Sequence, residues 1–96
     1  MPDAQPPEWF VYIIQASDDS LYTGITTDIG RRWQQHLTGK GGARYFHGRE
    51  PKRLMYLQGG YSRQSASRRE AEIKKLTRQQ KQLLLATAGP APDLLI

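Results

Sequence analysis

Apolar and polar positions divide the chain into segments with two different periods. Residues 9–15 read WFVYIIQ and residues 21–26 read LYTGIT, and the polar stretch ASDDS lies close between them. β-Branched and aromatic runs separated by turn residues are typical of a hairpin. A third run of this kind, KRLMYLQG at 52–59, predicts a third strand.

A helical period begins after the second strand. Asp28 is placed to cap the first turn, because its carboxylate can accept from free backbone N–H groups. Ile29, Trp33 and Leu37 follow at i, i+4 and i+8, which predicts one buried stripe on a helix. Gly39 is placed to end that helix.

Two more helices are predicted near the C-terminus. Residues 62–76 read SRQSASRREAEIKKL and have Ser62 or Ser65 near their start. Residues 77–88 read TRQQKQLLLATA, which predicts a further helix or a continuation of the preceding one, with Thr77 as a candidate cap. With a short helical turn at 43–46, the predicted order is β-β-α-β-α-α. We expect an α+β fold in which helices flank a three-stranded antiparallel sheet.

The length of 96 residues is enough for one small domain, which we place at 9–87. Three prolines predict disorder at 1–8, and 88–96 reads as a C-terminal tail. The start lacks the pattern of a signal peptide, and the apolar runs are too short to cross a bilayer. We therefore expect a cytoplasmic protein with no membrane contact.

Composition changes this picture in two respects. The chain has no cysteine, which excludes disulfides, a zinc ribbon and a thiol nucleophile. All fourteen Lys and Arg lie within 31–81 with only three acids, so that segment carries +11 (fourteen minus three) and the remainder carries −6. A basic segment of this size suggests nucleic acid as a partner, although a solubilising surface explains charge alone equally well.

Three polar side chains lie at the margins of predicted buried faces. Arg32 and His36 are i, i+4 neighbours beside the first helical stripe. Glu70 borders the stripe formed by Ala66, Ile73 and Leu76, where a carboxylate needs a partner or a metal. Taken one at a time, a snorkelling arginine, a boundary histidine and a salt-bridged glutamate are the commoner explanations.

Together these residues resemble a known pattern. The order is VYII, then YTG, then an arginine ten residues after the second tyrosine, a histidine four later and a glutamate on a later helix. This set resembles the GIY-YIG nuclease domain, and most closely its small stand-alone bacterial branch, the URI type. The resemblance extends from residue 9 to about residue 85.

The resemblance implies a metal-dependent endonuclease that hydrolyses phosphodiester bonds in DNA, with a role in DNA repair or processing. It implies one Mg²⁺ or Mn²⁺ ion held by Glu70, a phosphate contact by Arg32, and Tyr12 as general base, relayed to His36. Tyr22 would orient the water or a metal-bound ligand. The chain departs from many members in having no asparagine after the glutamate helix, where Gln79, Gln80 or Lys81 could substitute.

A shared tyrosine site makes a demand on the hairpin. Strand side chains alternate between faces, so a two-residue turn at Asp18-Asp19 would place Tyr12 and Tyr22 on opposite faces. A three- or five-residue loop, or a bulge, would place them on one face. We predict the odd count.

Nucleic-acid contacts are expected from a wider set. Gly24 has no side chain and would let a DNA backbone come close, and basic side chains would grip phosphates. Tyr45 and Phe46 could stack on a base, but core packing is the better expectation, and His47 reads as a surface residue. The predicted contact residues are Gly24, Lys40, Arg44, Arg49, Arg53, Arg69 and Lys81.

Two other functions stay open at this stage. One is a nucleic-acid-binding module that keeps the fold but cleaves little, and the other is a protein-interaction domain with an incidental basic face. The sequence leaves the substrate, the oligomeric state and any protein partner or homo-oligomer that selects substrate undetermined.

Overall fold

The computed structural model describes residues 6–91, so the predictions for 1–5 and 92–96 lie outside the described residues. Within this range the elements follow the predicted order β-β-α-β-α-α, with a 3₁₀ turn before the third strand. They are β1 (Trp9–Ala16), β2 (Leu21–Thr26), α1 (Ile29–Thr38), η1 (Arg44–Phe46), β3 (Pro51–Tyr61), α2 (Arg63–Lys74) and α3 (Arg78–Ala88).

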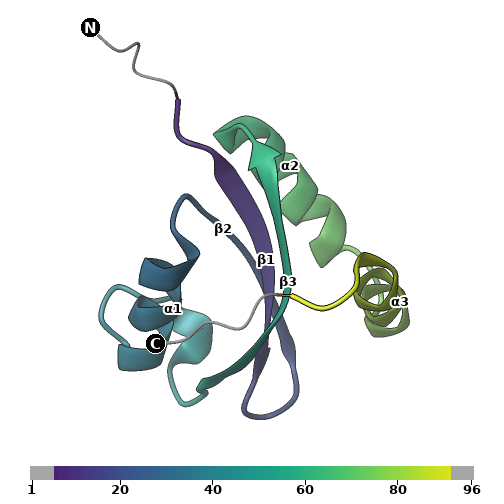
Figure 1. Cartoon of the computed structure of the whole chain (residues 1–96). Coiled ribbons are helices and arrows are strands. Elements are labelled where there is room, and N and C mark those ends of the chain that lie inside the picture. Colours follow the sequence, from purple (N-terminus) through teal and green to yellow (C-terminus); the bar gives the residue numbers. More distant parts are fainter. Residues whose placement is uncertain (1–5, 92–96) are drawn as a thin grey trace, which may run out of the picture.

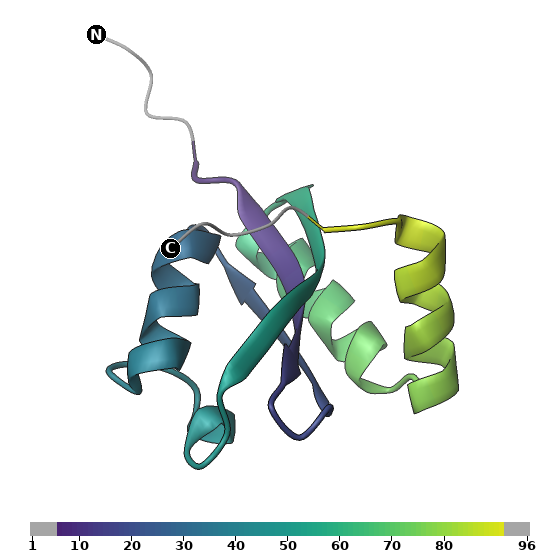
Figure 2. The ribbon, with the colours of Figure 1, turned by 60° about the horizontal axis from the view of Figure 1, so that its bottom comes forward.

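The sheet is antiparallel with strand order β2-β1-β3, so β1 is the central strand. Figures 1 and 2 show α1 and η1 on one side of the sheet and α2 and α3 on the other. This confirms the expected sheet flanked by helices. The third strand is longer than expected, and its pairing with β1 contains register shifts.

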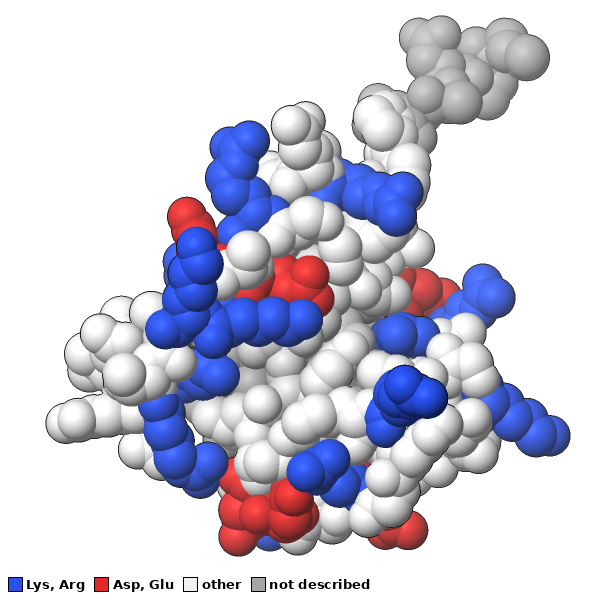
Figure 3. Space-filling view, turned by 180° about the vertical axis from the view of Figure 1, so that it is seen from behind, with Lys and Arg blue, Asp and Glu red and all other residues white. Residues whose placement is uncertain are grey.

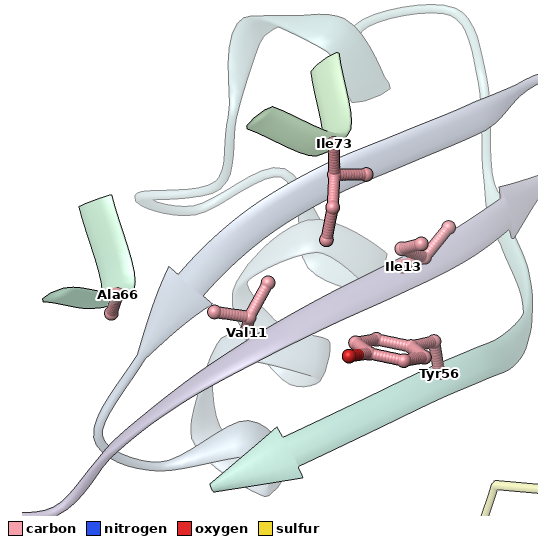
Figure 4. Close-up of a cluster of buried hydrophobic side chains, with 5 residues drawn as sticks. All are labelled: Val11, Ile13, Tyr56, Ala66 and Ile73. Carbon is pink, nitrogen blue, oxygen red and sulfur yellow. The ribbon is translucent and has the colours of Figure 1, made fainter. Parts of the chain in front are cut away.

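Both faces of β1 are buried, which explains its continuous apolar run. Val11 and Ile13 pack with Tyr56, Ala66 and Ile73 beneath α2 (Figure 4). The alternate side chains enter the opposite cluster, under α1 and η1, whose buried members are Tyr12, Ile14, Ala16, Phe46 and Leu54. The two clusters place the tyrosine of β1 on the α1 face.

The hairpin between β1 and β2 closes with an odd loop. The N–H of Ala16 donates to the carbonyl of Ser20 at 2.8 Å, which leaves three residues, 17–19, in the loop. Asp19 adopts φ 67°, the left-handed conformation that such loops need. Tyr12 pairs with Gly24 and Ile14 with Tyr22, so both tyrosines lie on one face, as predicted.

Helix α1 begins and ends as predicted but buries a different residue. The Asp28 carboxylate accepts from the N–H of Arg31, and Gly39 ends the helix at φ 76°. The expected third apolar position, Leu37, is 47% exposed, whereas His36 is 1% exposed. Around the helix axis, His36 (i+7) lies about 20° from Ile29 and Leu37 (i+8) lies about 80° from it. The helical period therefore favours burial of His36 beside Ile29.

Both C-terminal helices start with capping boxes. Ser62 pairs with Ser65 at α2, and Thr77 pairs with Gln80 at α3, so the predicted caps are confirmed. The side-chain oxygen of Gln80 accepts from the N–H of Thr77 at 2.9 Å. The Gln80 side chain is therefore engaged in capping α3. None of the helices within 6–91 is long and apolar enough to cross a membrane.

Candidate nuclease site at the β2 edge

Tyr12 is the centre of the site. Its side chain is fully buried, and its Oη lies 2.9 Å from Nε2 of His36. A Cβ atom at Gly24 would lie 2.5 Å from Tyr12 Oη and 2.6 Å from Cζ, so the phenol ring crosses β2 in the space that a side chain would fill. The ring of Tyr12 therefore fills the space that the missing side chain of Gly24 leaves open.

Aromatic packing holds the second tyrosine beside the first. The ring of Tyr22 lies 6.2 Å from that of Tyr12 and 5.5 Å from that of His36, centroid to centroid. Tyr45 and Phe46 pack against Tyr22 at 5.1 and 5.2 Å. These two residues therefore belong to the core, as expected, and they fix the position of Tyr22.

His36 joins this cluster from α1 and is held at both ring nitrogens. Nε2 faces Tyr12, and Nδ1 accepts from the backbone N–H of Ala43 at 3.2 Å. Burial lowers the pKa of His36 to about 4, and the positive charge of Arg32 acts in the same direction. The imidazole is therefore neutral at pH 7.

Arg32 lies half-buried on the same helix. Its Nη1 donates to the side-chain oxygen of Gln35 and to the carbonyl of Gly41, each at 2.9 Å. Burial raises the pKa of Tyr12, and the nearby Arg32 opposes that rise by favouring the phenolate. Arg32 also lines a hollow of about 240 Å³ with Arg31 and Trp9.

Glu70 approaches from the other face of the sheet. It lies on α2, which packs against β1 and β2, and its side chain is 23% exposed and pairs with Lys74 at 3.4 Å. The negative charge of Glu70 contributes to raising the pKa of Tyr12, which places the two groups within electrostatic reach. The ring of Tyr12 lies over Gly24 of β2, and α2 packs against the same strand from the other face.

No three His, Cys, Asp or Glu side chains within 6–91 come together as a metal cage. Glu70 of α2 offers a single, partly exposed carboxylate. One oxygen ligand, completed by water and by phosphate oxygens, suits Mg²⁺ or Mn²⁺, which retain several waters in such sites. The residues present thus fit a one-carboxylate ion site.

The predicted basic residues do not gather in one place. Lys40 and Arg44 are exposed on the segment after α1. Arg49 pairs with Asp18 at 2.7 Å and stacks on Tyr45. Figure 3 shows Lys and Arg side chains spread around the face seen from behind, with acidic side chains among them.

The remaining basic residues of the set lie on other elements. Arg53 belongs to β3, the outer strand at the opposite edge of the sheet. Arg69 pairs with Glu72 at 3.2 Å and borders a hollow with Leu84 of α3, and Lys81 lies on α3 itself. A DNA-binding surface at the β2 edge therefore includes only some of the predicted basic contact residues.

Two contributors to this site were missed in the sequence. The backbone N–H of Ala43 has no sequence signature of its own. Gly42, which lets the chain lie against α1, is visible only as part of the glycine-rich stretch TGKGGA. The sequence predicts a helix stop in this stretch, but nothing in it indicates the contact with His36.

Comparison with known proteins supports this fold. The model of the GIY-YIG catalytic domain matches residues 8–83. The chain therefore belongs to the GIY-YIG domain family, whose members form a nuclease superfamily.

Small bacterial proteins are similar over most of the chain. A UPF0213 protein of Desulfotalea psychrophila is 45% identical over 84 residues, which cover 88% of this chain and 76% of that protein. The UPF0213 protein YhbQ of Escherichia coli K12 is 42% identical over 87 residues, 91% of this chain and 86% of that protein.

Two solved structures share the fold. The solution structure of the UPF0213 protein BH0048 from Bacillus halodurans has a TM-score of 0.56 at 43% identity, covering 86% of this chain and 88% of that chain. The solution structure of EF2693 from E. faecalis has a TM-score of 0.57 at 30% identity, covering 91% of each chain.

Proposed function

We propose that this protein is a divalent-metal-dependent endonuclease that hydrolyses phosphodiester bonds in DNA. The observation that carries the proposal is the convergence of side chains from distant parts of the chain. Tyr12 of β1 and His36 of α1 form a buried hydrogen bond of 2.9 Å beside Tyr22, with Arg32 within electrostatic reach. Glu70 lies on α2, which packs against β2 from the other face of the sheet, and its negative charge acts on Tyr12.

Each side chain has a role that follows from its chemistry. The planar guanidinium of Arg32 binds the scissile phosphate through two parallel hydrogen bonds. Tyr12, as phenolate, takes the proton from the attacking water, and Tyr22 orients that water. Glu70 would hold the ion, which would supply charge stabilisation to the phosphate and to the leaving oxygen.

Protonation of Tyr12 is the main obstacle to this role. Burial raises its pKa, so without substrate the phenol keeps its proton at neutral pH. The positive charge of Arg32 lowers the pKa of Tyr12, and the negative charge of Glu70 raises it. A cation held by Glu70 would offset that negative charge. The Arg32 charge and such a cation both favour the phenolate, whereas burial, the largest influence on this pKa, favours the phenol.

The second candidate is a nucleic-acid-binding module that cleaves little. The observation that favours it is that Arg32 already donates hydrogen bonds within the protein. Its Nη1 already donates to Gln35 and Gly41, and those bonds compete with phosphate for the same donor. The two candidates separate at Glu70, since binding alone gains from removing a negative charge near phosphate.

The test compares Glu70→Gln with Glu72→Gln. Both glutamates lie on α2 and each pairs with one basic side chain, but Glu72 is an exposed residue paired with Arg69. Labelled duplex, single-stranded and branched DNA are incubated with each protein and Mg²⁺, Mn²⁺ or a chelator. We expect Glu70→Gln to lose about a hundredfold or more of the metal-dependent cleavage and Glu72→Gln to retain it.

Three outcomes would count against this proposal. No cleavage by the wild type, together with salt-sensitive DNA binding, would favour the binding module. Equal cleavage by both variants would remove Glu70 from the metal site. Cleavage that persists in the chelator would contradict the role of the ion.

A further inference from the structure

The segment after α1 runs back along the helix and reaches His36. Its closest approach is at Gly42, where a Cβ atom would lie 2.5 Å from the carbonyl oxygen of Gln35 and 2.9 Å from Cα of His36. These neighbours are backbone atoms, so no side-chain adjustment could relieve the contact. Arg32 ties the same segment down through the carbonyl of Gly41 at 2.9 Å.

This approach brings one backbone group onto the imidazole. The N–H of Ala43 lies 3.2 Å from Nδ1 of His36. A backbone N–H can only donate, so Nδ1 must offer its lone pair. A neutral imidazole then carries its proton on Nε2, the nitrogen 2.9 Å from Tyr12 Oη.

We propose that the segment 41–43 fixes His36 as a hydrogen-bond donor to Tyr12, with Gly42 as the positioning residue. This inference rests on the proposed function and deepens it. Since Nε2 donates, His36 does not take the phenolic proton. Once substrate is bound, the Tyr12 O–H proton passes to a water molecule, and His36 stabilises the negative oxygen that remains. That phenolate then accepts one proton from the attacking water and becomes a phenol again.

The opposite arrangement leaves two donors facing each other. If Tyr12 donated to Nε2, the neutral ring would carry its proton on Nδ1, which faces the N–H of Ala43 at 3.2 Å. A doubly protonated ring meets the same conflict. Both arrangements would require the glycine segment to move away from α1.

The first test reads the tautomer directly, without any nuclease assay. Two-bond ¹⁵N–¹H correlation spectra of ¹⁵N-histidine-labelled protein at neutral pH distinguish a protonated from an unprotonated ring nitrogen. The chain has two histidines, and the exposed His47 serves as the internal reference. We expect His36 as a single tautomer with protonated Nε2. A protonated Nδ1, or averaging like that of His47, would overturn the proposal.

The second test compares Gly42→Ala with Gly39→Ala. The control carries strain because Gly39 has φ +76°, but a Cβ there meets nothing within 4 Å. We expect averaged ring-nitrogen signals from His36 in Gly42→Ala and unchanged signals in Gly39→Ala. Unchanged signals in a folded Gly42→Ala would remove Gly42 from this role, and if that variant does not fold, the wild-type tautomer decides alone.

The third test asks what His36 does in turnover. Glutamine keeps an N–H donor at a similar reach but cannot act as a base. We expect His36→Gln to retain cleavage within about tenfold of the wild type and His36→Ala to lose about a hundredfold. Equal losses in both variants would show that His36 takes the proton. Absence of cleavage by the wild type would contradict the proposed function. The tautomer measurement would still decide whether His36 donates to Tyr12.

Discussion

Gly24 of β2 pairs with Tyr12 of β1, and the absence of a side chain at Gly24 leaves room for the Tyr12 ring. The phenol ring lies over Gly24 so closely that a Cβ atom would stand 2.5 Å from its Oη. The glycine is needed for its missing side chain, since its backbone has no left-handed φ. Gly24 therefore determines where the Tyr12 phenol lies.

Substitution of Gly24 by alanine tests this role. We expect Gly24→Ala to lower the free energy of unfolding by about 1–3 kcal/mol, because the ring of Tyr12 must move within a packed core. The same variant loses cleavage, since Oη leaves Nε2 of His36. Chemical denaturation and the cleavage assay measure the two effects.

A double-mutant cycle with Tyr12→Phe supplies the control for stability. Removing the hydroxyl deletes the atom nearest to the new Cβ, so part of the cost of Gly24→Ala is recovered in the phenylalanine background. Additive losses of stability would mean that the two side chains do not compete for this space.

At the scale of elements, the three-residue hairpin loop decides which face Tyr22 occupies. Asp18 and Asp19 support that loop in different ways. The Asp18 carboxylate accepts from the N–H of Ser20 at 3.1 Å and pairs with Arg49, and both partners lower its pKa. Asp19 holds the left-handed turn at φ 67° and pairs with Lys52 through an exposed contact.

These differences predict opposite effects of glycine at neighbouring positions. Asp19→Gly relieves the left-handed strain and loses only an exposed ion pair, so we expect stability to rise by up to about 1 kcal/mol. Asp18→Gly loses the hydrogen bonds that shape the loop, so we expect a fall of about 1 kcal/mol. Thermal unfolding of both variants measures the difference, and a loss of stability in Asp19→Gly would contradict this account.

The elements also show how far sequence reasoning reaches. Caps and glycine stops were predictable because they depend on a few neighbouring residues, as at Asp28 and Thr77. The odd number of residues in the hairpin loop was predictable because strand side chains alternate between the two faces of the sheet. Only an odd count or a bulge places both tyrosines on one face. The burial of His36 in place of Leu37 was missed, because an apolar pattern cannot include a polar residue whose partners come from β1 and the segment after α1.

On the scale of the whole molecule, the positive charge of 31–81 is divided between distant surfaces. Lys40 and Arg44 lie on the segment that packs against the face bearing Tyr22, whereas Arg53 lies on β3 at the other edge of the sheet. A DNA strand that reaches the β2 edge cannot use all of these charges equally.

This division predicts unequal contributions to DNA binding. We expect Lys40→Ala and Arg44→Ala each to weaken binding and to reduce the slope of log affinity against log salt by about 0.9 per lost phosphate contact on duplex DNA. Arg53→Ala is the matched control and should leave the slope unchanged. Fluorescence anisotropy over a salt series measures this, and equal slopes for all three variants would place the DNA elsewhere.

The sequence by itself determined the order of the elements, their caps, the antiparallel sheet and the candidate residues Tyr12, Tyr22, Arg32, His36 and Glu70. Local rules suffice there, because capping, alternation and helical period act over a few residues. Only the tertiary structure decided that the Tyr12 ring fills the space over Gly24, that Ala43 donates to His36, and that the basic residues lie at separate edges. Such contacts join segments far apart in the chain, and their geometry follows from packing.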